Sequence, residues 1–385
     1  MTTAPQPAAV RRPRVLIVVN VEWFFLSHRL PIALGLKRAG YEVEVAASVE
    51  QDRAGEIEAH GFPFTRLSLT RGSTNPLREL MIVWHLYRLY RKKRPDVVHH
   101  VAVKPVLYGS LAGRFAHVPA VVNAVPGLGY LFSNGGLRRR AATLMYRVCC
   151  LSRRNHFIFQ NPEDRDSLIA AGVASPHQTV LIRGSGVDVE KFRPSPEPEG
   201  PPVALMASRM LWDKGIAELI EAARLLRARG RACRIVLAGA PDLQNPRTVK
   251  PEELRAWQAE GLIEWWDHQH DMAAVFQRST FVVLPSYREG VPKALLEACA
   301  SGRAIVTTDV PGCREVVRHG ENGLLVPARD SRALADAIDE LASNPVRRQL
   351  MGEAGRAMAV AHFSETAVVD ETLKLYRDIL DARRP

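Results

Sequence analysis

Short apolar runs that alternate with helical segments most constrain the fold of this chain. Residues 14–20 form an apolar run with β-branched residues, and after a loop residues 30–40 show a helical pattern that ends on glycine. Residues 41–46 then alternate as a second strand. Strand, helix and strand in this order form a βαβ unit, and such units build doubly wound parallel sheets. Ligands of these sheets bind beyond the carboxyl ends of the strands, so the loop at residues 20–29 is predicted to face a cleft.

The same alternation starts again after residue 202, which predicts two domains. The second series consists of a strand, a helix and a strand, at residues 203–207, 216–229 and 235–239. A chain of 385 residues also exceeds what one compact core usually holds. Residues 194–202 are rich in proline without an apolar anchor, which is typical of a linker. We expect domains at 14–193 and 203–362, after a disordered tail at 1–13 that is no secretory signal.

One stretch of the second domain has the features of a phosphate site. Residues 281–284 form an apolar run that predicts a strand buried on both faces, and residues 286–290 form a polar turn. Pro292 follows at the start of a helix that continues through residues 294–298. The N-terminus of a helix has unpaired backbone N–H groups and a partial positive charge, so it is a natural seat for a phosphate.

Two carboxylates flank this seat. Glu289 lies in the turn, where it can accept hydrogen bonds from ligand hydroxyl groups, and Glu297 lies in the helix, where it can reach a vicinal diol such as ribose. A diphosphate between two hydroxyl-rich ends describes a nucleotide sugar. The alternative is a solvated helix face, because two glutamates at this spacing often arise by chance.

Two cations are predicted at the same edge of the second sheet. Arg209 and Lys214 lie in the loop between the strand at 203–207 and the helix that follows. They could hold a diphosphate, the arginine through forked hydrogen bonds and the lysine as a point charge. The alternative is a solvated pair of cations.

The loop at residues 20–29 combines aromatic and basic side chains. Three consecutive aromatic residues, 23–25, precede His28 and Arg29. We predict an acceptor site in which His28 or Arg29 meets an anionic group and the aromatic residues meet an apolar chain. The alternative is that the aromatic residues fix the following helix and that His28 caps it or packs.

A second acceptor contact is predicted after the strand at residues 96–100. His99, His100 and Lys104 lie at its carboxyl end, so they should face the same cleft. We assign His100 and Lys104 to the acceptor site. A histidine in such a place is also often structural.

The net charge of +11 belongs to the first half of the chain. Residues 1–195 hold 27 Lys and Arg against 14 Asp and Glu. These basic segments contain no nucleic-acid reader motif, so an anionic membrane is the expected partner and nucleic acid is not. A helix near residues 77–94 ends in a basic cluster and presents apolar residues at helical spacing, namely Leu80, Trp84, Tyr87 and Tyr90. This combination suits a helix at a membrane surface, and a core-packed helix with a solvated basic end is the equal alternative.

Three segments together resemble the family 4 glycosyltransferases, which are retaining enzymes with the GT-B fold. They are SRMLWDKGI at 208–216, LPSYREGVPKALLEA at 284–298 and DVPGCREVV at 309–317. The resemblance covers essentially the whole chain and is strongest to the branch that acts on polyprenyl-diphosphate-linked sugars. It implies an α/β fold of two Rossmann-like parallel-sheet domains that face each other across a cleft. A C-terminal helix at 363–385 would cross back onto the first domain.

The resemblance also implies roles for the site residues. Arg209 and Lys214 would bind the donor diphosphate and stabilise the charge on departing UDP. Glu289 would hold the transferred sugar and Glu297 the ribose. The remaining donor contacts, through backbone N–H groups in part, would come from Gly290, Val291, Pro292 and Lys293.

An enzyme of this kind transfers a sugar, here expected to be an N-acetylhexosamine, from a UDP-sugar to a lipid-linked glycan. It would lie in the cytoplasm on the inner face of a bacterial plasma membrane and need no cofactor beyond the UDP-sugar. No metal is expected: the five cysteines form no CxxC pair, and the DxD pattern at 164–166 falls in a first helical turn. The alternatives are an acceptor-independent UDP-sugar epimerase and a non-catalytic nucleotide-sugar-binding subunit.

Overall fold

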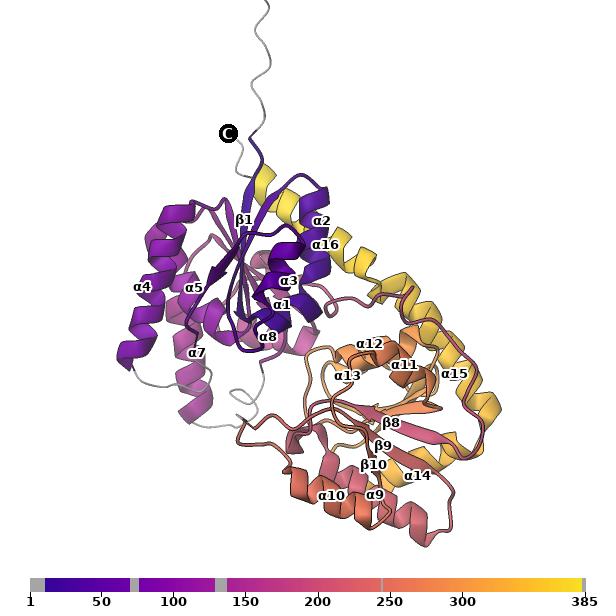
Figure 1. Cartoon of the computed structure of the whole chain (residues 1–385). Coiled ribbons are helices and arrows are strands. Elements are labelled where there is room, and N and C mark those ends of the chain that lie inside the picture. The colour runs from indigo at the N-terminus through magenta and orange to yellow at the C-terminus, as the bar shows by residue number, and fades with distance from the viewer. Residues whose placement is uncertain (1–10, 70–75, 129–136, 244, 383–385) are drawn as a thin grey trace, which may run out of the picture.

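Two α/β domains stand one above the other, and the C-terminal helices run along the second domain and then along the first (Figure 1). The computed structural model describes residues 11–69, 76–128, 137–243 and 245–382. Most of the predicted tail, residues 1–10, lies outside these ranges. No helix among the described residues is long and apolar enough to cross a bilayer.

The first domain is a parallel sheet of seven strands within the described residues, in the order β3-β2-β1-β4-β5-β6-β7. Its strands are β1 (Arg14–Val21), β2 (Glu42–Ser48), β3 (Phe64–Arg66), β4 (Val97–Val101), β5 (Ala120–Val125), β6 (Asn155–Phe159) and β7 (Thr179–Leu181). Its helices are α1 (Glu22–His28), α2 (Leu30–Arg38), α3 (Ala54–Ala59), α4 (Pro76–Lys93), α5 (Val103–Ala116), α7 (Leu137–Cys149) and α8 (Pro162–Ala170), with a short η1 (Pro176–Gln178). The predicted strand–helix alternation is therefore confirmed.

The second domain repeats this architecture with six described strands, in the order β10-β9-β8-β11-β12-β13. They are β8 (Val203–Ala207), β9 (Arg234–Ala238), β10 (Glu264–Trp265), β11 (Phe281–Leu284), β12 (Ile305–Thr308) and β13 (Gly323–Val326). The helices are η2 (Trp212–Lys214), α9 (Ile216–Ala228), α10 (Pro251–Ala259), α11 (Met272–Gln277), α12 (Lys293–Ala300), α13 (Cys313–Val316), α14 (Ser331–Ser343), α15 (Pro345–Met358), η3 (Ala359–Phe363) and α16 (Glu365–Asp381). Because all pairings in both sheets are parallel, the strands of each sheet end at one common edge.

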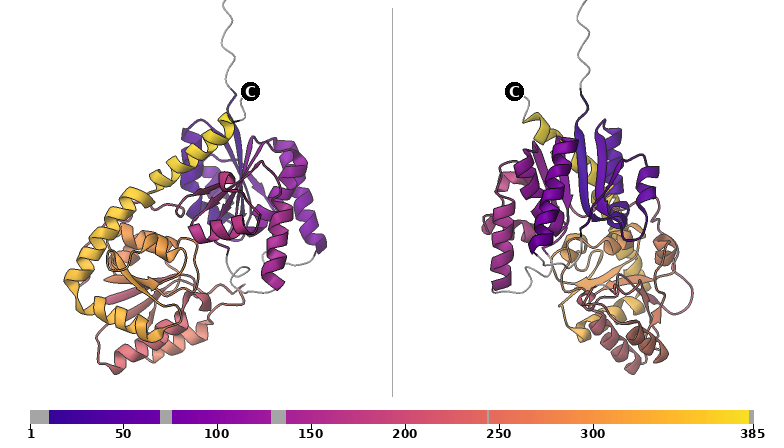
Figure 2. Two further views of the ribbon diagram at one scale, coloured as in Figure 1. Left: turned by 180° about the vertical axis from the view of Figure 1, so that it is seen from behind. Right: turned by 60° about the vertical axis from the view of Figure 1, so that its left-hand side comes forward.

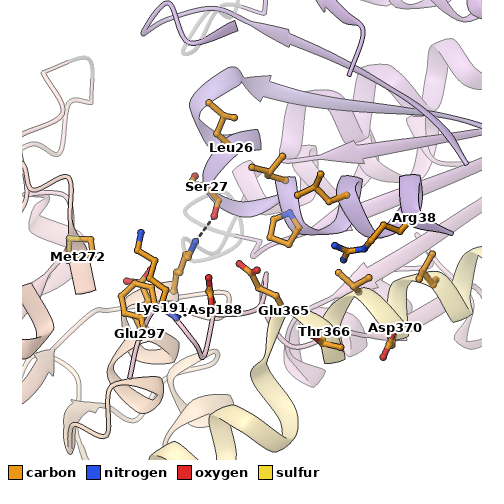
Figure 3. A pocket seen from close by; sticks show the side chains of 18 of the residues that line it. Leu26, Ser27, Arg38, Asp188, Lys191, Met272, Glu297, Glu365, Thr366 and Asp370 are labelled. Carbon is orange, nitrogen blue, oxygen red and sulfur yellow. Dashed lines mark hydrogen bonds between the residues drawn. The ribbon is translucent and has the colours of Figure 1, made fainter. Parts of the chain in front are cut away.

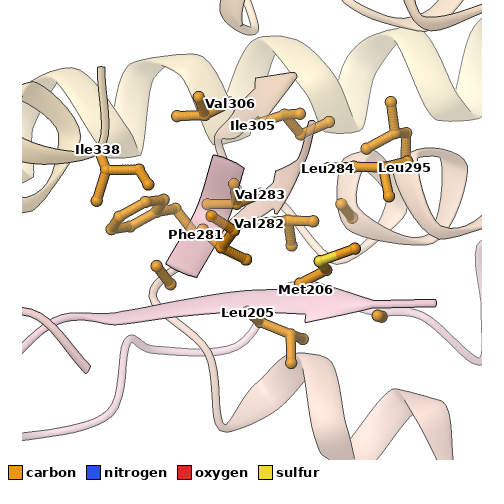
Figure 4. Close-up of a cluster of buried hydrophobic side chains, with 14 of the residues drawn as sticks. Leu205, Met206, Phe281, Val282, Val283, Leu284, Leu295, Ile305, Val306 and Ile338 are labelled. Atoms are coloured by element: carbon orange, nitrogen blue, oxygen red, sulfur yellow. The ribbon is translucent and has the colours of Figure 1, made fainter. Parts of the chain in front are cut away.

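Strand β11 lies at the centre of the second core. All four of its side chains are buried, because helices cover both faces of the sheet. Leu205 and Met206 of β8 and Ile305 of β12 pack beside it (Figure 4). This rigid strand fixes where the polar turn after Leu284 begins.

Helix α16 crosses from the second domain to the first, as predicted (Figure 2). It packs on α2, where a Cβ added to Gly35 would lie 2.3 Å from Val369 Cγ1. The Tyr376 hydroxyl also hydrogen-bonds the buried His99 Nδ1 at 2.7 Å. The helix therefore belongs to the core of the first domain although it follows the second in sequence.

The segment between β7 and β8 is held against the second domain. Arg303 donates to Ser195 Oγ at 2.8 Å, and Arg348 forms an ion pair with Glu197 at 2.7 Å. These contacts hold the proline-rich residues 194–202 against the second domain.

The stretch predicted as a loop at residues 20–29 contains a helix, α1. Of its aromatic residues, Phe25 is buried against Phe62, while Trp23 and Phe24 are partly exposed. Phe25 therefore belongs to the core, and the predicted contact of the aromatic residues with an apolar chain of the acceptor is wrong for Phe25.

Candidate functional site

Two loops meet at the carboxyl edge of the second sheet, because β8 and β11 are neighbouring strands. The backbone N–H of Tyr287 donates to the carbonyl of Asp213 at 3.0 Å, which joins the loop after β8 to the turn after β11. Gly215 permits this approach: a Cβ there would lie 2.0 Å from the Pro285 carbonyl oxygen, and its φ is +76°. Only glycine adopts this conformation without strain in so little space.

Lys214 and Glu289, which come from these two loops, form an ion pair. Their side chains are 21% and 12% exposed, so water screens the pair only in part. Ser286 Oγ also donates to Glu289 Oε1 at 2.6 Å. The predicted phosphate-binding lysine and sugar-binding glutamate are therefore side by side.

Arg209 lies at the same edge and pairs with Asp242, in the loop after β9, at 2.7 Å. Its side chain is 52% exposed, whereas Asp242 is mostly buried. Both predicted cations thus have carboxylate partners within the protein. A diphosphate at this edge would compete with Asp242 and Glu289 for them.

A cavity of about 680 Å³ lies between this edge and the first domain. The second domain contributes Arg209, Lys293 and Glu297, and the first domain contributes Trp23 and His28. The cavity also reaches the residues after β9 and His268. Lys214 and Glu289 are not part of the lining of this cavity.

Glu297 is the most perturbed carboxyl group of the cavity. It is only 8% exposed, and burial raises its pKa to about 7 against the opposing effect of Lys293 and Lys191. A carboxyl group with this pKa is partly protonated near neutral pH. It can therefore accept hydrogen bonds and, when protonated, also donate one.

His28 faces the cavity as a neutral side chain. Burial and the neighbouring cations Lys293 and Arg29 lower its pKa to about 3. Its ring stacks on Phe24 with 4.2 Å between centroids, and Ser27 Oγ lies 2.6 Å from Nδ1. His28 therefore offers a hydrogen bond to a ligand but no positive charge.

Two predicted acceptor residues are buried inside the first domain. Arg29 is 4% exposed, and burial lowers its pKa to about 10. His100 is fully buried and bonded to Tyr90 Oη and Asn123 Oδ1, each at 2.9 Å. The expectation that these side chains face the cleft is wrong, because each points into the packing between the sheet and its helices.

Lys104, the fourth predicted acceptor residue, lies in the first turn of α5. It forms an ion pair with Glu79 of α4 at 2.8 Å, and its side chain is 20% exposed. Its charge is therefore compensated within the protein, and an acceptor contact through Lys104 stays a prediction.

The residues between the two glutamates face the first domain. Gly290 lies against the backbone of Pro126, since an added Cβ would lie 1.5 Å from that carbonyl oxygen. The Val291 N–H, predicted to point at the donor, donates to Gln160 Oε1 at 3.0 Å, so this part of the prediction is wrong. Pro292, predicted as the first residue of the helix, is the N-cap of α12, so the helix begins one residue later, at Lys293.

Lys293 contacts the first domain directly, because its ammonium group donates to the Ser27 carbonyl. A larger cavity, of about 880 Å³, shares Ser27, Lys293 and Glu297 with the first one. Figure 3 shows Leu26 and Ser27 on one side of it, with Asp188, Glu297 and Glu365 on the other. The two cavities together form the cleft between the domains.

Nothing in the described part of the chain gathers three or more His, Cys, Asp or Glu side chains as a metal site would. In the DxD pattern, Asp164 is 1% exposed and pairs with Arg288 of the second domain at 2.5 Å. Sequence reasoning missed this contact and that of Gln160. The one sequence feature that could have indicated Asp164 and Gln160 is that both follow β6 and so lie near the carboxyl edge of the first sheet.

Family models match both domains. Residues 14–161 match the model described as glycosyl transferase 4-like, and residues 188–358 match glycosyl transferases group 1. The N,N'-diacetylbacillosaminyl-diphospho-undecaprenol alpha-1,3-N-acetylgalactosaminyltransferase of Campylobacter jejuni is 27% identical over 92% of this chain and 98% of its own length. The UDP-Gal:alpha-D-GlcNAc-diphosphoundecaprenol alpha-1,3-galactosyltransferase of Escherichia coli is 24% identical over 79% of this chain and 81% of its own length.

Solved structures share the same arrangement of domains. Sucrose-phosphate synthase from Thermosynechococcus elongatus aligns with a TM-score of 0.77 at 19% identity, over 96% of this chain and 100% of that one. HepE from Anabaena, solved in complex with UDP, aligns with a TM-score of 0.76 at 17% identity, over 95% of this chain and 100% of that one. At these identities the likeness shows the fold alone.

Proposed function

We propose that this chain, which belongs to the glycosyltransferases of the GT-B fold, moves an N-acetylhexosamine from a UDP-sugar to a polyprenyl-diphosphate-linked glycan. The observation that carries the proposal is the carboxyl edge of the second sheet, where Arg209 and Glu297 line the interdomain cavity and Lys214 pairs with Glu289. In this proposal the two cations, Arg209 and Lys214, bind the diphosphate. The carboxyl group of Glu297 binds the ribose, and Glu289 binds the transferred sugar. Two relatives whose names specify diphosphoundecaprenol-linked substrates support the choice of acceptor.

The chemistry follows from the charges. As the bond between the sugar C1 and the phosphate oxygen breaks, negative charge grows on UDP, and Arg209 and Lys214 stabilise it. The acceptor hydroxyl attacks C1 from the same face and passes its proton to the departing phosphate oxygen. The new glycosidic bond then has the original anomeric configuration, and no metal is needed, because the two cations neutralise the leaving group.

Helix α4 supports a peripheral place on an anionic membrane. Four of its apolar side chains are at least half exposed, namely Leu77, Leu80, Met81 and Trp84. Arg88 stacks over Trp84 at 4.6 Å, and the helix ends in the basic residues 91–93. Tyr90, which sequence reasoning placed on the same face, is buried instead, so the helix both packs on the core and presents an apolar, basic surface.

A transfer assay tests this function. The protein is incubated with a panel of UDP-hexoses and UDP-N-acetylhexosamines, with and without a polyprenyl-diphosphate-linked sugar, and released UDP is measured. We expect release that requires the lipid-linked acceptor and continues in excess chelator. Conversion of a UDP-sugar without any acceptor would instead indicate an epimerase, and binding without conversion would indicate a non-catalytic subunit.

A further inference from the structure

Asp164 of α8 lies at the contact between the domains. Its carboxylate is almost fully buried and accepts hydrogen bonds from the Leu128 N–H at 3.2 Å and from Asn161 Nδ2 at 3.0 Å. Both of these donors belong to the first domain and are neutral. Neither donor carries a charge that compensates the carboxylate.

The compensating charge comes from the second domain. Arg288 Nη2 donates to Asp164 Oδ1 at 2.5 Å, and the arginine side chain is 27% exposed. Its Nε is buried without a hydrogen-bond partner among the described residues. Asp164 is therefore the carboxylate that holds Arg288 in place.

Arg288 directly precedes Glu289, and the residues after Glu289 also rest on the first domain. The Val291 N–H donates to Gln160 Oε1, four residues before Asp164, at 3.0 Å. Gly290 lies against the Pro126 carbonyl group, as its missing Cβ allows. The turn that carries Glu289 is thus fixed by the first domain on both sides of that residue.

We propose that Asp164 is a positioning residue, which through Arg288 fixes the turn that carries Glu289 when the two domains close. This inference rests on the proposed function, because it assigns Glu289 to the transferred sugar. Separation of the domains would break this ion pair and leave the Asp164 carboxylate with only its two neutral donors in the first domain, so the closed form is favoured. The contact that forms when the domains close therefore also places Glu289.

Hydrogen–deuterium exchange of residues 286–293 tests the inference without any substrate. In Asp164→Asn the carboxamide keeps the shape and one oxygen acceptor but loses the charge. We expect faster exchange in this turn of the second domain, although the substitution lies in the first. The matched control is Asp166→Asn, two residues along α8, whose exposed carboxylate pairs with Arg165 of the same helix. Exchange in this control should equal that of the wild type.

Transfer kinetics give the second readout. Loss of one charge-assisted contact predicts a kcat about ten- to a hundred-fold lower in both Asp164→Asn and Arg288→Gln, with unchanged affinity for free UDP. The double variant should lose no more than the worse single variant, because both act through one contact.

Three results would overturn the inference: unchanged exchange at residues 286–293 in Asp164→Asn, a wild-type kcat in Arg288→Gln, or losses that multiply in the double variant. Failure of the wild type to bind UDP would contradict the proposed function instead. The exchange comparison would still decide whether Asp164 holds the turn.

Discussion

Substitution of Glu297 by glutamine has an effect on stability whose size follows from the structure. Burial raises the pKa of this carboxyl group from 4.5 to about 7. Below about pH 4.5 the group is protonated in both the folded and the unfolded chain, so it makes no difference to stability. Between about pH 4.5 and 7 the unfolded chain ionises first, and the folded state loses stability as the pH rises. Above about pH 7 the loss is constant, at about 3 kcal/mol.

Glutamine is neutral at every pH and is therefore free of this loss. Urea unfolding of the wild type and of Glu297→Gln at about pH 5 and about pH 8 measures the effect. The free energy of unfolding of the variant, relative to that of the wild type, should be about 2 kcal/mol higher at about pH 8 than at about pH 5. Other acids with a raised pKa, such as the half-buried Glu365, are present in both proteins and cancel in the difference.

Glu353→Gln is the matched control, since Glu353 is an exposed carboxylate on α15. Its stability difference from the wild type should not vary with pH. A pH-independent difference for Glu297→Gln as well would refute the reasoning, because it would mean that Glu297 is ionised as easily in the folded chain as in water. If the variant instead lost stability relative to the wild type as the pH rises, Lys293 and Lys191 would outweigh burial in setting the pKa of Glu297.

Three further predictions follow from the described contacts. Lys214→Ala should lower kcat about ten- to a hundred-fold, because one charge-assisted contact to departing UDP is lost, and a wild-type kcat would contradict that role. Arg29→Met should leave the free energy of unfolding unchanged or raise it, because the buried guanidinium group has no carboxylate partner among the described residues; a loss of more than about 2 kcal/mol would contradict this. Leu80→Ser combined with Trp84→Ser should weaken sedimentation with anionic vesicles and leave unfolding unchanged, whereas undiminished sedimentation would exclude α4 as the membrane surface.

The sequence was most informative where one segment determines its own environment. The strand at 281–284 is apolar at every position, so its burial on both faces was predictable, and Pro292 indicated the helix start to within one residue. Glu289 and Lys214 were each assigned to the carboxyl edge of the second sheet because parallel strands end together. Their direct ion pair depends on the neighbouring order of β8 and β11, which no local pattern reveals.

The same reasoning failed for His100 because it locates the end of a strand but not the direction of a side chain. Successive residues of β4 point to opposite faces: His99 meets Tyr376 of α16, and His100 meets Tyr90 of α4. The Asp164–Arg288 pair was not predictable either, since it joins two domains whose relative position depends on the whole chain.

Binding of UDP and of uridine to the wild type, Arg209→Ala and Lys214→Ala tests the central claim most directly. If the two cations hold the diphosphate, each variant should bind UDP about ten- to a hundred-fold more weakly than the wild type, since each loses a charge-assisted contact. Uridine has no phosphate, so calorimetry should find its affinity the same in all three proteins. Equal UDP affinity in the three proteins would contradict the account, and so would equal losses for UDP and uridine.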